Sequence, residues 1–288
     1  MLEKFKTYLK KELRYSDHTT VAYVKDVDQF FEILVLDPND YSKVSIMDSR
    51  GFVMTLMDAG LDPKSVNRKI SSLKKFYRFC MTHSGLEKSP VANLKNVKTD
   101  KPIPEFVREE EMIQLEELTN LFSDDKEGLR DRLMVELFYQ TGIRRSELIE
   151  LKITDWQNET IKVLGKRNKE RIIPVSKDLS ALKESYLAVR ESDKESDEYL
   201  LLTDKGNKLY PKFVYRKINH YIGEVSRLKK KSPHILRHSF ATHMLNNGAG
   251  IETIKEILGH ESLVATQIYT HNSFEKLKSI YKQAHPRG

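Results

Sequence analysis

The chain has 288 residues, of which 32% are charged and 39% hydrophobic, and its mean hydropathy is −0.55. No apolar run approaches the roughly 20 residues that span a bilayer, and the first residues lack the apolar stretch of a signal peptide, so the sequence excludes a membrane protein. The single cysteine, Cys80, excludes an internal disulfide and agrees with a reducing cytoplasm, while the formal net charge of +7 favours a polyanionic partner.

Residues 2–94 carry apolar side chains at intervals of three and four, which predicts helices rather than strands. Residues typical of helix boundaries punctuate this pattern: Ser45 and Pro63 as starts, Gly60 and Gly85 as ends. We therefore expect a compact N-terminal domain of four helices over residues 1–97.

The fourth of these helices, from Pro63 to about residue 83, has an almost uniformly basic polar side. A basic helix face is often no more than a solvated surface, but it also suits the phosphates of a polyanionic partner such as DNA. The candidates for DNA contact on this helix are Lys64, Asn67, Arg68, Lys74 and Lys75.

Residues 98–107 include two prolines, which favour extended backbone, and we interpret this segment as an interdomain linker. After it, the second domain, 108–288, is predicted to be mostly helical, with helices at 108–121, 128–140, from 145, 179–191, 211–225, 233–247, 251–258 and 273–283. Segments 160–164 and 171–175 alternate as strands and flank a basic loop, which predicts a β-hairpin. The fold class is thus mainly α with a small antiparallel β-sheet. The sequence contains no Gly-rich phosphate-binding loop, so a nucleotide cofactor is not indicated.

Two arginines, Arg144 and Arg237, are the candidates for holding a phosphate. A guanidinium is planar, forked and permanently charged, so a pair can bind both non-bridging oxygens of one phosphate. His234 lies three residues before Arg237, hence on the same helix face, where it can reach the same phosphate or accept a proton from a nucleophile.

Tyr269 is the candidate nucleophile, and His260 precedes it by nine residues. Because a tyrosine titrates near 10, its attack on a phosphodiester at neutral pH needs a cationic pocket. The departing sugar oxygen needs a proton, for which Lys166 on the hairpin loop is the predicted acid and Lys169 the alternative.

Other polar residues near these motifs have plainer interpretations. Glu147, beside Arg144, is expected to orient the guanidinium rather than to transfer a proton. His238 and His243 are expected to pack or cap. His234 and His238 have the spacing of a zinc pair, but the glutamate between them and a third ligand are missing and Arg237 would repel a cation, so no metal is expected.

Six motifs together resemble the tyrosine recombinase (phage integrase) family, and within it the Xer type. They are Thr-Gly-Ile-Arg-Arg-Ser-Glu-Leu, Gly-Lys-Arg-Asn-Lys-Glu-Arg, His-Ile-Leu-Arg-His-Ser-Phe-Ala-Thr-His, Leu-Gly-His-Glu-Ser-Leu, Thr-Gln-Ile-Tyr-Thr-His and a tail of Ala-His-Pro-Arg, and they stand in the family's order. The resemblance covers the whole chain and implies a SAM-like, core-binding N-terminal domain followed by a catalytic domain.

The resemblance implies a catalytic set of Arg144, Lys166, His234, Arg237, His260 and Tyr269. The tyrosine would form a 3′-phosphotyrosyl link and free a 5′-hydroxyl, without metal or other cofactor. Double-stranded DNA would be clamped between the domains, and strand exchange would pass through a Holliday junction held by four identical or paired protomers. The helix at 273–283 resembles the one that such proteins donate to a neighbour, with Leu277, Ile280 and Tyr281 as its apolar stripe.

The chain departs slightly from the family pattern, since Arg145 replaces a small or apolar residue and Arg167 replaces a glycine of the hairpin loop. Together with Lys169 they add positive charge and are predicted to contact DNA. The resemblance favours site-specific recombination for resolving chromosome or plasmid dimers. The alternatives are an integrase or transposase of a mobile element, a topoisomerase-like enzyme and a non-catalytic DNA-binding protein. A second recombinase or a DNA translocase are further candidate partners.

Overall fold

The computed structural model describes residues 1–99, 105–118, 121–165, 170–191, 196–259 and 271–287, with the side chains of 271–276 left out. The chain divides into two compact units, Met1–Ile103 and Pro104–Gly288, each with its own hydrophobic core. None of the helices over these residues combines the length and the apolar composition that crossing a membrane requires.

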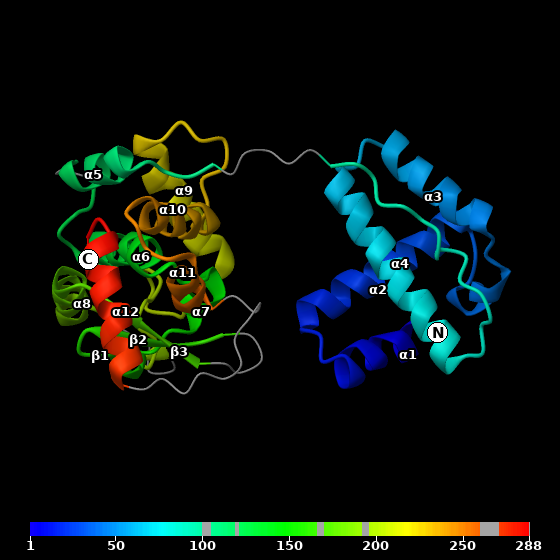
Figure 1. Cartoon of the computed structure of the whole chain (residues 1–288), viewed down its shortest axis with the longest axis horizontal. Helices are drawn as coiled ribbons and strands as arrows, with labels where there is room; N and C mark the ends of the chain where they lie inside the picture. The colour runs from blue at the N-terminus through cyan, green and yellow to red at the C-terminus, as the bar shows by residue number, and fades with distance from the viewer. Residues whose placement is uncertain (100–104, 119–120, 166–169, 192–195, 260–270, 288) are drawn as a thin grey trace. The chain divides into compact units, whose positions relative to one another are not determined.

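The first unit is built of helices, as predicted (Figure 1). Its elements are α1 (Leu2–Thr7), which continues into a π-helical turn η1 (Tyr8–Glu12), α2 (Asp17–Leu34), a 3₁₀ segment η2 (Pro38–Lys43), α3 (Ile46–Asp58) and α4 (Pro63–His83). The predicted starts are found: Ser45 caps α3 in a reciprocal pair with Asp48, and Pro63 occupies the first turn of α4 behind the cap residue Asp62.

Aromatic rings and one buried charge network hold the first unit together. Phe76 of α4 meets Phe5 and Phe31 edge to face at centroid separations of 5.3 and 5.7 Å. On the same helix, Lys69 is buried and donates to the carboxylate of Asp26 at 3.0 Å, so part of the basic character of α4 serves the fold itself.

The second unit contains the sheet and the remaining helices. Its elements are α5 (Glu109–Glu117), α6 (Lys126–Thr141), α7 (Arg145–Glu150), η3 (Ile153–Asp155), β1 (Trp156–Gln157), β2 (Thr160–Leu164), β3 (Glu170–Pro174), α8 (Lys177–Val189), α9 (Pro211–Val225), α10 (Pro233–Asn246), α11 (Ile251–Leu258) and α12 (His271–Ala284). The predicted hairpin is β2–β3, paired antiparallel with Ile161 opposite Ile173. The short strand β1, which pairs with β2, was not predicted because two residues carry no readable period.

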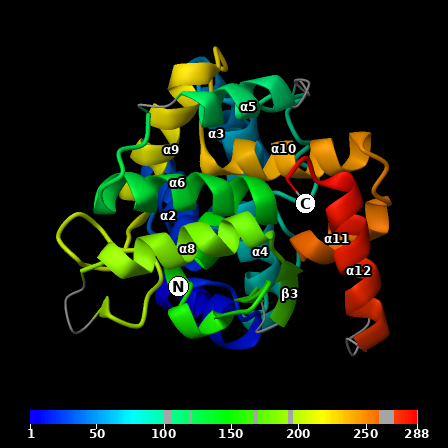
Figure 2. The ribbon, with the colours of Figure 1, turned by 90° about the vertical axis from the view of Figure 1, so that its left-hand side faces the viewer.

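Helix α6 is the centre of the second unit, and α8 and α10 both pack against it (Figure 2). It ends at Gly142, whose φ of +59° suits glycine, and a Cβ there would lie only 2.6 Å from Leu258 and 2.7 Å from Phe240. The turn after α6 therefore packs closely between α10 and the end of α11, and it fixes the position of Arg144, two residues further on.

The boundaries differ from the predicted ones in two places. Val107, predicted to be the last linker residue, is fully buried in the second unit, and its N–H donates to Ser239 Oγ at 2.9 Å, so this unit begins before residue 108. Helix α5 ends at Glu117 rather than near 121.

Candidate functional site: an arginine cluster at the end of helix α11

Arg144 is held by the start of helix α7. It is the residue that caps α7, and its backbone N–H donates to Glu147 Oε2 at 2.8 Å while its Nη1 donates to Glu147 Oε1 at 2.7 Å. The carboxylate therefore fixes both the backbone and the guanidinium of Arg144, the orienting contact that the sequence suggested for Glu147.

Arg237 reaches the same place from helix α10. Its Nη1 donates to the carbonyl of Gly142 and its Nη2 to the carbonyl of Leu258 at 2.8 Å, while Arg144 Nη2 donates to the next carbonyl, Gly259 O, at 3.0 Å. Two guanidiniums that are far apart in sequence thus meet on consecutive carbonyls, where the chain leaves α11.

A third arginine, Arg171 on β3, belongs to the same cluster and was not predicted. Its Nη1 and Nη2 donate to the two oxygens of Glu147 at 2.9 and 2.7 Å, and its Nε donates to Ile257 O at 2.7 Å. The side chain is buried on the same face of the strand as Ile173. A cation at an inward-facing strand position is the signal that could have identified it.

The charges in this cluster do not balance. Burial by itself would raise the pKa of Glu147, but the hydrogen bonds and charges of Arg171 and Arg144 lower it to about 2. Burial and the neighbouring charges of Arg144 and Arg171 lower the pKa of Arg237 to about 10. Three guanidiniums around one carboxylate leave a net positive site, which a bound anion would neutralise.

His234 lies one turn before Arg237 on α10, at the edge of the cluster. The ring is accessible to solvent, yet partial desolvation and the charges of Arg145, Arg237 and Arg144 lower its pKa below the usual value near 6.5. The imidazole is therefore neutral at pH 7 and able to accept a proton. Arg145, the first residue of α7, is half-buried.

Several predicted residues lie outside the described part of the chain: Lys166, Arg167, Lys169, His260 and Tyr269. His260 follows directly on Gly259, whose carbonyl binds Arg144, and the last residue described before the hairpin loop is Gly165.

The residues of α4 that were predicted to contact DNA fall into two groups. Asn67 and Lys74 are engaged within the unit, since Asn67 exchanges hydrogen bonds with the backbone of Val97 and Lys74 Nζ donates to Leu94 O at 2.6 Å. Of the other three, Lys64 is exposed and Arg68 is exposed but paired with Asp26, whereas Lys75 is half-buried and lies over the ring of Tyr15 at 5.8 Å.

His243 has the packing role that the sequence suggested. It is buried and shares a 3.0 Å hydrogen bond with the hydroxyl of Tyr139. Helix α12 packs beside α10 on its own unit (Figure 2), with Leu277 and Tyr281 buried in the core. The apolar stripe predicted for donation is thus covered by the same chain.

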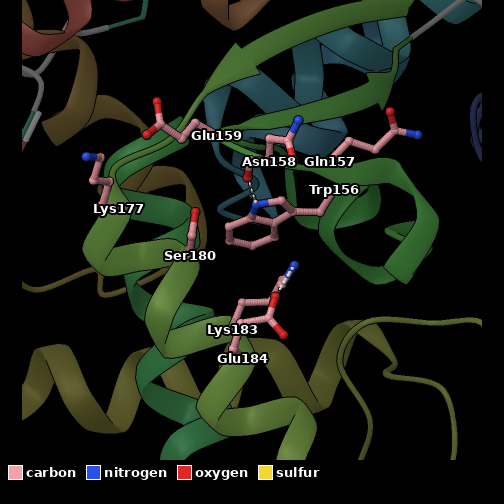
Figure 3. Close-up of a pocket in the computed structure, with 8 residues that line it drawn as sticks. All are labelled: Trp156, Gln157, Asn158, Glu159, Lys177, Ser180, Lys183 and Glu184. Carbon is pink, nitrogen blue, oxygen red and sulfur yellow. Dashed lines mark hydrogen bonds and ion pairs between the residues drawn. The ribbon is translucent and has the colours of Figure 1, made fainter.

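A shallow hollow lies away from the arginine cluster. It is lined by residues of β1, α8 and the turn between β1 and β2 (Figure 3), and none of the predicted catalytic residues is among them. Lys183 lies over the Trp156 ring at 5.2 Å, and the indole N–H donates to Asn158 O. Within the described ranges no three His, Cys, Asp or Glu side chains gather as a metal site.

Comparison with known proteins places both units. Residues 105–276 match the model of the Phage integrase family, and residues 2–83 match that of the Phage integrase, N-terminal SAM-like domain. Tyrosine recombinase XerC of Chlorobaculum parvum is 38% identical over 316 aligned positions, covering 99% of this chain and 94% of the relative. The XerC of Staphylococcus saprophyticus is also 38% identical, covering 97% and 95%.

Solved structures show the same fold at lower identity. XerH site-specific recombinase bound to a palindromic difH substrate superimposes with a TM-score of 0.72 at 23% identity, covering 97% of this chain and 83% of that one. The Tn1549 transposon integrase in complex with transposon right end DNA gives a TM-score of 0.73 at 17% identity, covering 96% and 97%.

Proposed function

Because the chain belongs to the phage integrase family of tyrosine recombinases, we propose that it cuts and rejoins double-stranded DNA at specific sites, using the arginine cluster to hold the scissile phosphate. The observation that carries this proposal is the convergence of Arg144 and Arg237 on adjacent carbonyls at the end of α11. Each guanidinium has further N–H donors beyond those bound to described residues, and these donors and the unbalanced positive charge suit the two non-bridging oxygens of a phosphodiester.

In the proposed reaction the hydroxyl oxygen of Tyr269 attacks the phosphorus and the bond to the 5′-oxygen breaks. His234, neutral at pH 7, accepts the tyrosine proton, and Lys166, with Lys169 as the alternative, protonates the departing 5′-oxygen. The product is a 3′-phosphotyrosyl ester and a free 5′-hydroxyl. Attack by a 5′-hydroxyl of a second duplex reverses the step and exchanges the strands.

The positive charge of the cluster suits the proposed phosphoryl transfer. Charge accumulates on the phosphate oxygens during the transfer, and preorganised guanidiniums stabilise it without reorganising. Glu147 orients Arg144, and His260, next to the carbonyl that Arg144 binds, is proposed to face the same phosphate. No group in this scheme requires a metal or a nucleotide.

The first unit is proposed to be the core-binding domain, with the linker at 98–107 leading to the catalytic domain. Lys64, Arg68 and Lys75 of α4, with Arg145, Arg167 and Lys169 near the site, are the proposed phosphate contacts. Asn67 and Lys74 would have to leave their partners in the segment 94–97 to join them. We also propose that the protein acts in the cytoplasm, where chromosomal and plasmid DNA lie.

We further propose that four protomers assemble on two sites through exchange of α12. The stripe of Leu277 and Tyr281 now fills the chain's own core, so exchange would vacate a groove that a neighbour's α12 can refill without loss of buried area. The relatives named XerC favour a role in resolving chromosome or plasmid dimers, with integration of a mobile element as the second candidate.

The test is covalent capture of DNA. The protein is incubated with nicked suicide duplexes made from its host's replication terminus and from neighbouring mobile elements, and the trapped sequences are read. The wild type is expected to form an adduct, and Tyr269→Phe to bind the same duplex while forming none. An adduct of normal yield with Tyr269→Phe would reassign the nucleophile. Binding without any adduct in the wild type would favour a non-catalytic DNA-binding protein, and trapped mobile-element ends would favour the integrase.

A further inference from the structure

The cluster contains one charged side chain for which the proposed reaction has no use. Arg171 is 4% exposed, and all of its donors that are assigned point inward: two to Glu147 and one to Ile257 O. Glu147 and Ile257 together occupy Nε, Nη1 and Nη2, so this guanidinium is not arranged to bind a phosphate.

Its contacts instead connect β3 to Glu147 on α7 and to the last turn of α11. Glu147 Oε1 accepts from both Arg171 and Arg144, so a single carboxylate oxygen links the two guanidiniums. The Nε contact ties the same side chain to the last turn of α11, from which the chain runs on to His260. The aliphatic part also packs against Gly259, where a Cβ would lie 3.1 Å from Arg171 Cδ.

The place of Arg171 in the strand adds a third connection. It is the second residue of β3, pairs with Val163 of β2, and stands five positions after Lys166 in the sequence. A lysine here could keep the charge, but it could not bind both carboxylate oxygens and the Ile257 carbonyl at once, because it has a single nitrogen and no planar fork.

We propose that Arg171 is a positioning residue of the recombinase: through Glu147 it fixes the orientation in which Arg144 presents its guanidinium to the phosphate. The inference rests on the proposed function for its catalytic consequence. Without Arg171 the carboxylate of Glu147 loses the two hydrogen bonds that attach it to β3. Only the backbone N–H and Nη1 of Arg144 then hold it, so we expect its contact with the guanidinium of Arg144 to loosen. The low pKa of Glu147 agrees with this, since it keeps the carboxylate ionised and its hydrogen bonds intact.

The experiment is a double-mutant cycle on a suicide duplex that the wild type cleaves. Arg171→Lys is expected to slow formation of the covalent adduct by about 10- to 100-fold, the effect of weakening a charged hydrogen bond, at unchanged affinity for the duplex. If Arg171 acts through Glu147, the double variant Arg171→Lys with Glu147→Gln is no slower than the slower single variant. Effects that multiply would overturn the proposal, because Arg171 would then act independently of the carboxylate.

A matched control separates positioning from stability. Arg130 is also a buried arginine, bound to Asp131 and Asp204 in the same unit, and Arg130→Lys should lower the melting temperature without slowing cleavage by the folded protein. Equal slowing by Arg130→Lys and Arg171→Lys would assign Arg171 a merely structural role.

A crystal structure of the Arg171→Lys protein without DNA provides an independent measurement. The proposal expects the contact between Arg144 Nη1 and Glu147 Oε1 to be lengthened or broken; an unchanged contact would refute it. If the wild type cleaves no duplex, the proposed function fails, while this structure still decides what Arg171 holds.

Discussion

Two arginines in the second unit, Arg130, which is buried, and Arg237, which is partly buried, show how a guanidinium held by carboxylates differs from one that we propose binds a ligand. Arg130 is 1% exposed and lies between the carboxylates of Asp131 and Asp204, whose charges and hydrogen bonds outweigh the desolvation and raise its pKa. Arg237 is part-buried, and among the described residues its hydrogen bonds go only to carbonyls. Its pKa is lowered to about 10 by burial and by the charges of Arg144 and Arg171.

One physical cause explains why the pKa of Arg130 is raised and that of Arg237 is lowered. Each guanidinium loses hydration on burial, but only Arg130 is given carboxylates that replace it. Carbonyl dipoles at the end of α11 satisfy the donors of Arg237 without cancelling its charge. A site that folds with uncompensated charge is less stable by itself and is poised to bind the missing anion.

The largest effect is expected from Arg237→Gln. Removing the charge should slow covalent capture of DNA at saturating duplex by about 10³-fold, the scale measured for a lost donor at a developing oxyanion. Because the arginine is repelled by its neighbours, the substitution should change the free energy of unfolding much less than a change at Arg130 does. A slowing of less than about ten-fold would show that Arg237 does not bind the scissile phosphate.

The converse change is Arg130→Met. It leaves Asp131 buried beside Lys217 but without its main partner, and should lower the free energy of unfolding by about 3–5 kcal/mol, as when one member of a buried ion pair is removed. Urea denaturation measures the loss, and adduct formation by the folded protein at low temperature is the control. A variant that stays stable but cleaves slowly would erase the distinction between the two arginines.

Much of the fold follows from local sequence signals. The cap residues Ser45 and Asp62 and the change of period at Thr160 fix helices and hairpin, because capping and alternation are local physics. The two-residue strand β1 and the burial of Val107 depend on tertiary pairing, which no local pattern records.

The site divides in the same way. Arg144, Arg237 and Glu147 were identifiable because phosphate chemistry names the side chains it needs, and the structure brings these three together. Arg171 escaped notice because it touches the carboxylate rather than the substrate, and the carbonyls of α11 escaped because backbone acceptors have no sequence signature. The catalytic roles of Arg144, Lys166, His234, Arg237, His260 and Tyr269 all stay predictions.

The smallest effect concerns pH and tests whether the excess charge reaches His234. Its pKa is lowered by partial desolvation and by Arg145, Arg237 and Arg144, so as pH falls the ring stays neutral to below pH 6.5 before it protonates and cleavage slows. Arg145→Gln removes one of these charges and should move the inflection of the rate profile upward by a few tenths of a pH unit, whereas Arg130→Lys should not move it.

Glu147, with a pKa of about 2, stays ionised throughout and cannot supply the inflection. Buried His243 also has a lowered pKa, so stability falls as pH drops below about 6.5, and circular dichroism at each pH must show a folded protein. An inflection that does not move with Arg145→Gln would mean that the proton acceptor of the reaction lies outside the field of the arginine cluster.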